Sequence, residues 1–250
     1  MSSPNADNRQ NSLSAGQLQG EPPLGRELTE RLLAISHEYC QAEGGCHGPD
    51  HTERVHNLAL HIGRLMNARL DILSAAALLH DIGRSHEMLS QGKICHATKG
   101  AEMSRTILTG LGFSQEMQEA ILHCIEAHRY RNNKIPETLE AKILFDADKL
   151  DSIGAIGIGR AFLFAGQVGA RLHNRGVDVT KTRSYSTEDT AYREFLVKLC
   201  KIKDKMLTPE GKRLAAERHE FMEIFFKRLD KEIHGSPPTN PDTPQSPRLP

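Results

Sequence analysis

Apolar residues recur at intervals of three and four along most of this chain, and no segment longer than a few residues alternates between apolar and polar side chains. This periodicity predicts α-helices rather than β-strands. The densest apolar segment, residues 70–84 (LDILSAAALLHDIGR), is apolar on almost every side, so we expect a central buried helix that ends near residue 82. Amphipathic stripes predict the other helices, over residues 24–43, 51–68, 96–111, 115–129, 137–150, 152–173, 188–206 and 209–234.

Capping signals mark where several of these helices begin. Asp50 with Glu53 resembles a capping box for the helix at 51–68, and Ser114 is placed to cap the helix at 115–129. Thr208 followed by Pro209 is typical of a helix start. We expect a polar loop at 85–94 and a mobile, basic loop at 174–186.

Both ends of the chain have the composition of disordered segments. Residues 1–24 are rich in Ser, Asn, Gln and Gly, and residues 235–250 are rich in proline, which precludes a helix there. The predicted fold class is therefore all-α, with a single helical-bundle domain over residues 25–234 between disordered N- and C-terminal tails.

The charge balance argues against some classes of partner. Lys and Arg number 32, as do Asp and Glu, so the formal charge is zero and no broad surface for a nucleic-acid polymer or a membrane is expected. No apolar run is long enough to span a bilayer. Five cysteines without a paired pattern, and no secretory signal before them, favour a reduced, cytoplasmic setting.

The central helix ends in two ionisable residues, His80 and Asp81. Such a pair at the end of a buried helix is costly unless something binds it. A hydrogen-bonded couple is one explanation, and a divalent metal is another, because histidine supplies a neutral nitrogen and aspartate an anionic oxygen. We expect Gly83 to let the chain turn away just beyond.

Further metal-type ligands lie on the apolar faces of other predicted helices. His123 does not, because it is about 140° around its helix from His128. For any one inward histidine a hydrogen-bonded core residue is the simpler interpretation, but so many together favour a metal centre. The inward set comprises His51, His80 with Asp81, His96, His128 and Asp148.

These residues and their surroundings resemble a known superfamily. The chain is similar to the HD-domain metal-dependent phosphohydrolases, and most similar to a branch of uncharacterised HD hydrolases. The resemblance covers roughly residues 25–234. It is carried by DHTERVHNLAL, AAALLHDIGR, HATKGAEMSRTIL, IEAHRYR, EAKILFDADKLDSIGAIGIGRAF and TPEGKRLAAERHEFMEIFFKRL.

The resemblance implies an all-α HD fold that binds one divalent metal, with Mn²⁺ or Mg²⁺ favoured over Fe, Co, Ni or Zn. The implied ligands are His51, His80, Asp81 and Asp148. His96 and His128 fall where two-metal members place extra ligands, and here either bind a second metal or line a phosphate pocket. Several nucleotidase-like members have an acidic residue soon after the HD pair. This chain has HDIGR, so its general acid or base is not identified.

The expected function is hydrolysis of a small phosphorylated metabolite, a nucleotide in the first instance, with cleavage of nucleoside triphosphates to monophosphate and pyrophosphate as the specific form. The alternatives are a 5′-nucleotidase or other phosphomonoesterase, a di-iron HD oxygenase, and a non-catalytic nucleotide-sensing module. The oligomeric state is left open.

Basic residues near the motifs are candidates for handling phosphate. Asp81 and Lys149 are the candidate catalytic residues. The candidate substrate-binding residues are His96, His128, Arg129, Arg84 and Arg160, and for each cation a surface ion pair is the alternative. The loop at 174–186 carries Arg175, Lys181 and Arg183, which suit either a lid over a polyphosphate or a solvated connector.

Overall fold

The computed structural model describes residues 23–40, 48–129 and 134–235, so nearly all of the two predicted tails lies outside the described residues. Within the described residues all regular structure is helical, which confirms the all-α prediction. The α-helices are α1 (Arg26–Cys40), α2 (Pro49–Leu65), α3 (Leu70–Leu79), α4 (Arg84–Leu89), α5 (His96–Gly110), α6 (Gln115–Ala127), α7 (Leu139–Leu150), α8 (Gly154–Gln167), α9 (Ala191–Val197) and α10 (Pro209–Ile233). Short 3₁₀ helices η1 (Val179–Lys181), η2 (Leu199–Lys201) and η3 (Lys203–Lys205) flank α9.

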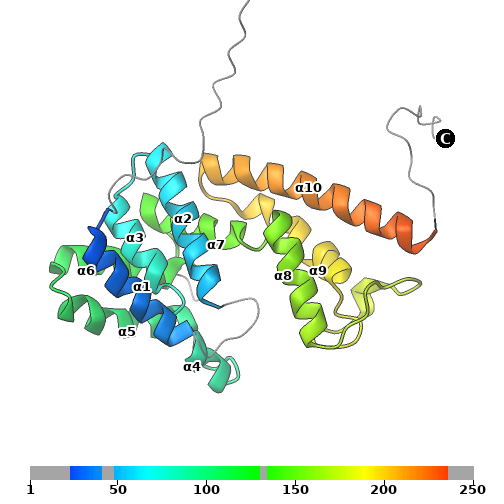
Figure 1. Ribbon diagram of the computed structural model, residues 1–250, viewed down its shortest axis with the longest axis horizontal. Helices are drawn as coiled ribbons and strands as arrows, with labels where there is room; N and C mark the ends of the chain where they lie inside the picture. Colours follow the sequence, from blue (N-terminus) through cyan, green and yellow to red (C-terminus); the bar gives the residue numbers. More distant parts are fainter. Residues whose placement is uncertain (1–22, 41–47, 130–133, 236–250) are drawn as a thin grey trace, which may run out of the picture.

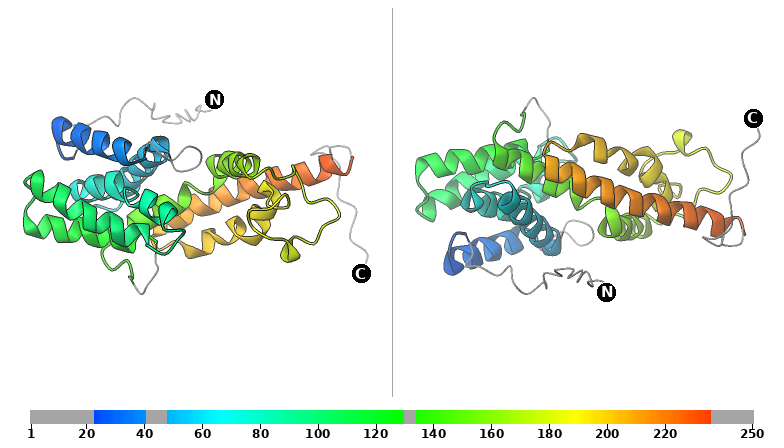
Figure 2. Two further views of the ribbon diagram at one scale, coloured as in Figure 1. Left: turned by 90° about the horizontal axis from the view of Figure 1, so that it is seen from below. Right: turned by 90° about the horizontal axis from the view of Figure 1, so that it is seen from above.

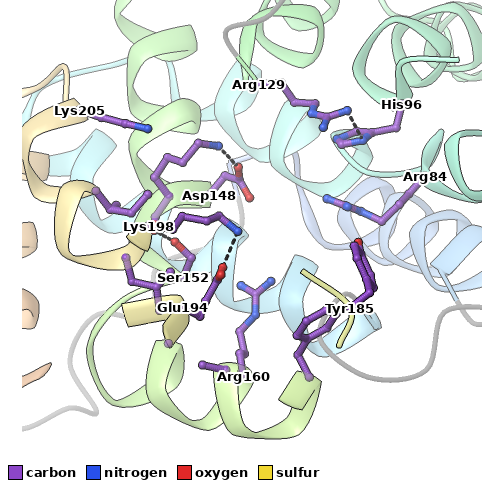
Figure 3. Close-up of a pocket in the computed structure, with 16 residues that line it drawn as sticks. Arg84, His96, Arg129, Asp148, Ser152, Arg160, Tyr185, Glu194, Lys198 and Lys205 are labelled. Carbon is purple, nitrogen blue, oxygen red and sulfur yellow. Dashed lines mark hydrogen bonds and ion pairs between the residues drawn. The ribbon is translucent and has the colours of Figure 1, made fainter. Parts of the chain in front are cut away.

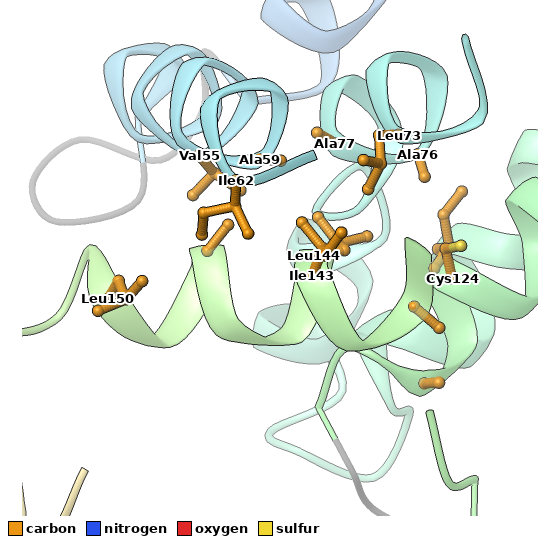
Figure 4. Packing of buried hydrophobic residues seen from close by; sticks show 14 of the residues in the cluster. Val55, Ala59, Ile62, Leu73, Ala76, Ala77, Cys124, Ile143, Leu144 and Leu150 are labelled. Atoms are coloured by element: carbon orange, nitrogen blue, oxygen red, sulfur yellow. The ribbon is translucent and has the colours of Figure 1, made fainter. Parts of the chain in front are cut away.

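The central helix is α3, as the apolar pattern predicts. Every residue from 72 to 79 is buried, and α3 packs against α1, α2, α6 and α7. Val55 and Ile62 of α2 face Leu144 of α7 in the same core (Figure 4). This packing brings the first turn of α2 close to the C-terminal ends of α3 and α7.

Gly83, just beyond α3, is needed for close approach rather than for a turn. Its φ of −85° is open to any residue. A Cβ atom there would lie 2.4 Å from the carbonyl oxygen of His96 and 2.5 Å from the amide nitrogen of Gly100. The glycine therefore lets the start of α5 lie against the end of α3, which brings His96 toward His80 and Asp81.

The helices α8, α9 and α10 extend from one end of this bundle (Figures 1 and 2). Asp146 of α7 fixes the start of α10: its carboxylate accepts hydrogen bonds from the amides of Leu207 and Thr208 and from the Thr208 hydroxyl, at 2.8, 2.8 and 2.6 Å. Because α10 packs on both α7 and α8, this attachment sets α8 beside the end of α7.

Some predicted elements are wrong in detail. The predicted loop at 85–94 begins with α4, and α8 ends at Gln167 instead of continuing to 173. The single helix predicted over 188–206 is α9 followed by η2 and η3, because the backbone of Lys198 leaves the helical region with φ −135°. The capping box at Asp50 is also wrong, since Gly48 is the N-cap and Pro49 opens α2.

The predicted caps at Ser114 and Thr208 are confirmed, each side chain accepting a backbone N–H three residues on. None of the helices in the described part of the chain combines the length and the apolar character needed to cross a bilayer.

Candidate metal centre and substrate pocket

Three of the predicted metal ligands meet in the buried interior. His51 lies in the first turn of α2, and His80 and Asp81 directly follow the last residue of α3. The Nε2 atom of His51 is 3.5 Å from Oδ2 of Asp81, and the same oxygen is 3.6 Å from Nε2 of His80. One ligand atom from each of the three lies within 4.8 Å of the others, as expected of atoms that share one metal ion.

Asp148, in the last turn of α7, completes the predicted set. Its Oδ1 is 3.5 Å from Nε2 of His51, and its Oδ2 accepts a hydrogen bond of 2.7 Å from Lys149. Burial favours the neutral acid, but Lys149 and His51 hold the pKa of Asp148 well below its usual range. The carboxylate is therefore ionised, as a metal ligand must be.

The protonation of His80 suits metal binding. Its Nδ1 lies 2.8 Å from the carbonyl oxygen of Ala77, to which it must donate, so its Nε2 carries the lone pair. This nitrogen is fully buried and has no hydrogen-bond partner among the residues that the structure describes. A buried acceptor of this kind is costly unless a ligand occupies the space in front of it, and a cation fits.

A residue that the sequence analysis did not assign, Asp151, orients His51. Its Oδ2 is 2.7 Å from Nδ1 of His51, and it also accepts hydrogen bonds from Arg54 and Arg160. A carboxylate on the far nitrogen of a histidine is a common support for metal ligands. Burial lowers the pKa of His51, but hydrogen bonds that its ring donates to the carboxylates of Asp148, Asp151 and Asp81 raise it to about 10, so a bound metal would displace a proton.

The helix positions of Asp81 and Asp148 also favour a bound cation. Asp81 follows the C-terminal end of α3, and Asp148 lies in the last turn of α7. The C-terminal end of a helix carries partial negative charge, which disfavours carboxylates and favours cations. A divalent ion between Asp81 and Asp148 would relieve this repulsion at both helix ends.

His96 and His128 form a second cluster around the other oxygen of Asp81. Oδ1 of Asp81 lies 3.3 Å from Nε2 of His96 and 3.7 Å from Nε2 of His128. The four imidazole rings form a row, with centroid separations of 5.4, 5.1 and 5.1 Å from His51 through His80 and His128 to His96. The structure thus brings all the predicted inward ligands to one place, with Asp81 between two groups.

The protonation of this second cluster is unusual. Nδ1 of His128 donates to the carbonyl oxygen of Ile125 at 2.6 Å, and Nδ1 of His96 contacts the carboxylate of Glu87. Burial lowers the pKa of His96 to about 4 and that of His128 well below its usual range, so both rings are neutral. With the proton of each ring on Nδ1, the two Nε2 lone pairs face each other at 3.1 Å, which is repulsive unless a further proton or a cation lies between them.

Glu87 is a site residue that the sequence analysis missed. It lies in α4, which was expected to be loop, and it also accepts a hydrogen bond of 2.6 Å from Arg129. Burial raises the pKa of Glu87, but His96 and Arg129 lower it overall, so the carboxylate is ionised. Glu87 is thus an acidic residue that follows the HD pair, six positions after Asp81, and its carboxylate contacts Nδ1 of His96.

A pocket of about 570 Å³ opens beside this centre (Figure 3). All four predicted cations line it, and each contacts a carboxylate of the centre. Arg84 binds both oxygens of Asp81 at 2.8 and 3.0 Å. The four nearest pairs, with their N···O distances, are Asp81–Arg84 (2.8 Å), Asp148–Lys149 (2.7 Å), Asp151–Arg160 (2.6 Å) and Glu87–Arg129 (2.6 Å).

The opposite wall of the pocket was not predicted. Glu194 and Lys198 come from α9 and its end, with their charged groups 2.6 Å apart, and Lys205 comes from η3. From the segment 174–186, Tyr185 lines the pocket but Arg175, Lys181 and Arg183 do not. Lys181 instead lies 3.5 Å from Asp178 on the surface. No helical periodicity marks Tyr185, so the sequence offered no signal for it.

Comparison with known proteins agrees with this architecture. The family model of the HD domain matches residues 50–153, and all four predicted metal ligands lie within this span. The uncharacterised protein YpgQ of Bacillus subtilis (strain 168) is 34% identical over 197 residues, a stretch that is 77% of this chain and 87% of YpgQ.

Solved structures are similar over most of the chain as well. The crystal structure of Bacillus subtilis YpgQ in complex with ADP superposes with a TM-score of 0.65 at 31% identity, covering 83% of this chain and 98% of that one. An HD-superfamily hydrolase from Bacillus thuringiensis superposes with a TM-score of 0.66 at 27% identity, covering 84% and 98%.

Proposed function

The chain belongs to the HD-domain superfamily of hydrolases, and from that premise we propose that it hydrolyses a nucleotide, in the specific form of a nucleoside triphosphate cleaved to the monophosphate and pyrophosphate. In this reaction water attacks the α-phosphorus, and the bond from that phosphorus to the bridging oxygen breaks. Pyrophosphate leaves, and the proton released by the water passes to a base.

The residues that would hold one divalent metal, Mn²⁺ or Mg²⁺, are His51, His80, Asp81 and Asp148. Two nitrogen and two oxygen ligands leave positions open on a six-coordinate ion. The buried lone pair of His80 supports this assignment. When bound, such an ion lowers the pKa of a coordinated water and withdraws electron density from a phosphoryl oxygen.

One observation carries the choice of a polyanionic substrate. Each of the four carboxylates around the centre already has a Lys or Arg partner. A divalent ion therefore leaves the site with excess positive charge, and Lys205 adds to it on the far wall, where Lys198 is paired with Glu194. A single phosphate would neutralise only part of this charge, whereas a triphosphate would neutralise most of it.

The cations of the pocket have separate proposed roles. Lys149 is next to the proposed ligand Asp148, and its role is to stabilise charge on the reacting phosphoryl group. Arg129, which contacts His96, adds a second positive charge for the same purpose. Arg84 and Arg160 donate hydrogen bonds to Asp81 and Asp151 and also line the pocket. Guanidinium groups suit this double task because they donate in several directions.

The nucleotide part of the proposal has independent support. YpgQ, which is similar over almost its whole length, crystallises with ADP. Free thiols at Cys95, Cys124 and Cys200 support a reducing, cytoplasmic setting for the activity.

The facing lone pairs of His96 and His128 support one alternative within the same scaffold. A second metal held by these two residues and Asp81 would remove the repulsion between the two lone pairs. The alternative hypothesis of a di-iron oxygenase requires such an ion. A single shared proton, or a proton on a bound phosphate, removes it equally well and fits the hydrolase. Counting metal ions per chain in purified protein distinguishes the two.

The direct test is product analysis. The full-length protein is incubated with Mn²⁺ and a panel of nucleoside tri-, di- and monophosphates, and the products are followed by ³¹P NMR. We expect monophosphate and pyrophosphate from triphosphates, and no products from the His80→Ala variant. Inorganic phosphate from monophosphates would indicate a nucleotidase instead, and tight nucleotide binding without turnover would indicate a sensing module.

A further inference from the structure

The pocket has an aromatic end that neither the metal centre nor its cations use. Tyr185 and Phe164 both line it, with their ring centroids 5.6 Å apart and the ring planes at 77°. Tyr185 is 78% exposed, yet it lies at the rim of the pocket near Arg160 (Figure 3). The two rings form an aromatic corner at the mouth of a pocket that also holds the charged residues around the metal centre.

The position of Tyr185 is imposed by buried polar contacts. Its backbone has φ +57°, and its amide donates to Oδ2 of Asp189 at 2.7 Å. The other oxygen of Asp189 accepts from Arg193 at 2.7 Å, and Arg193 also donates to Thr182. Asp189 and Arg193 are buried, so this network holds the segment in a defined conformation.

This arrangement does little for the stability of the folded chain. A left-handed conformation at a non-glycine residue costs on the order of 1 kcal/mol, and an exposed ring buries little apolar surface in return. Backbone strain that the surroundings impose is concentrated at ligand clamps and active sites. The exposed Tyr185 ring is therefore held where a ligand in the pocket could contact it.

The pocket face of α8 has an order that suits an elongated ligand with two unlike ends. Gly157, Arg160 and Phe164 lie along one face of the helix and line the pocket. Gly157 is next to Ser152 at the end of α7 that holds Asp148, and Phe164 is seven residues further on. At 1.5 Å per residue these positions are about 10 Å apart along the axis, the scale of a nucleoside with its first phosphate.

We propose that Tyr185 and Phe164 form a stacking subsite for the base of a nucleotide whose phosphates lie at the metal centre. Aromatic rings bind all bases by stacking, so this subsite selects nucleotides over inorganic polyphosphates and small sugar phosphates without fixing which base is bound. The inference rests on the proposed function, because it places the phosphates among the cations around Asp148.

Calorimetric titration of the full-length protein with Mn²⁺ tests the subsite separately from catalysis. ADP and inorganic pyrophosphate are the two probes, and both carry a diphosphate. We expect Tyr185→Ala to weaken ADP binding about tenfold, from the loss of one stacking contact, and to leave pyrophosphate binding unchanged. Tyr185→Phe retains the ring and should bind ADP within about twofold of the wild type.

Lys181→Ala is the matched control, because it lies in the same segment but outside the pocket wall. We expect it to bind both probes like the wild type. Equal weakening of ADP and pyrophosphate by Tyr185→Ala would overturn the stacking subsite, as would unchanged ADP binding in that variant. Failure of the wild type to bind ADP would overturn it as well.

The proposed function and the stacking subsite can each be wrong while the other is right. If ADP binding depends on the Tyr185 ring and no nucleotide is hydrolysed, the subsite is supported and the hydrolytic proposal is wrong. If triphosphates are hydrolysed and the KM for the nucleotide does not respond to Tyr185→Ala, the hydrolytic proposal is supported and the subsite is wrong.

Discussion

The two sides of the pocket are built in different ways. The ligand region (residues 48–153) places its functional groups at the ends of long, well-packed helices, and His51, His80 and Asp81 are almost fully buried. The wall region (residues 154–205) places its groups on α8, the short helix α9 and 3₁₀ turns, and Tyr185 and Lys198 are exposed. The HD match ends where the wall region begins.

Under the proposed function, this difference separates the residues of the metal centre from those that select the substrate. Buried, mutually bonded ligands have almost no freedom to change without losing the site. Side chains on a half-exposed wall can change with little effect on stability, since most surface substitutions alter it by less than about 0.5 kcal/mol. We therefore expect substitutions in the ligand region to abolish turnover and substitutions in the wall region to change which ligand is bound.

The largest effect is expected for Asp81→Ala, which removes the one residue shared by both ligand clusters. Metal content should fall to background and turnover should fall at least about a thousandfold, because water activation depends on the ion. Elemental analysis and phosphate release measure these losses. Asp204→Ala, on the exposed surface of the wall region, is the control. Near-normal turnover in Asp81→Ala would remove the metal centre as the site of chemistry.

The next largest effect is expected for His128→Ala, and His123→Ala in the same helix region is its control. His128→Ala removes a buried group that contacts Asp81 and His96, whereas His123 accepts a hydrogen bond from the amide of Glu137 away from the site. We expect kcat to fall about a hundredfold for His128→Ala and to stay within about twofold for His123→Ala. Equal steady-state rates in the two variants would mean that the second cluster has no part in turnover.

A smaller effect is expected for Asp151→Asn, which weakens the support of His51 without removing a ligand. The affinity for Mn²⁺ should fall about 10- to 100-fold, as is usual when the partner of a metal-binding histidine is changed. Activity should return at high Mn²⁺ concentration. Asp50→Asn is a matched control, because Asp50 shares Arg54 with Asp151 but does not contact His51. An unchanged Mn²⁺ titration curve would show that Asp151 is only structural.

In the wall region, Lys198→Ala should raise the KM for a nucleoside triphosphate several-fold and leave the affinity for metal unchanged. Its ammonium group lines the pocket beside Glu194 but contacts no metal ligand. Partly exposed charges of this kind contribute about 1 kcal/mol or less. Steady-state kinetics with tri- and monophosphates measure the change. A loss of bound Mn²⁺ in this variant would contradict the separation of the two regions.

The smallest effect lies in the ligand region but away from the ligands. Burial lowers the pKa of His56 to about 4, and its Nε2 lies 2.8 Å from the hydroxyl of Ser74. Between pH 6.5 and 4 the unfolded chain takes up a proton at His56 that the folded chain does not, so stability falls as the pH is lowered through this window. In His56→Gln this loss is absent.

Thermal unfolding with saturating Mn²⁺ measures the difference. Between pH 7 and pH 5.5 the wild type should lose about 1 kcal/mol more than His56→Gln. Parallel pH profiles for the two proteins would show that His56 is not excluded from protonation in the folded state.

Helical periodicity was enough to predict the helical class, the central position of α3 and the inward set of candidate ligands. The reason is local: a period near 3.6 fixes which residues share a face, and an apolar face must be buried. His51, His96, His128 and Asp148 each continue an apolar stripe, so their direction follows from their own helix. The resemblance to HD hydrolases added their role as ligands.

The side chains that support those candidate ligands, and those that face them across the pocket, follow from how the helices pack. Asp151 contacts His51, which is 100 positions away in the sequence. Glu87 contacts His96 from α4, a helix whose polar composition predicts a loop. Tyr185 and Lys198 lie where periodic patterns stop, because the backbone there leaves regular helix. Contacts between distant segments depend on how helices pack, and the period of a single helix carries no information about them.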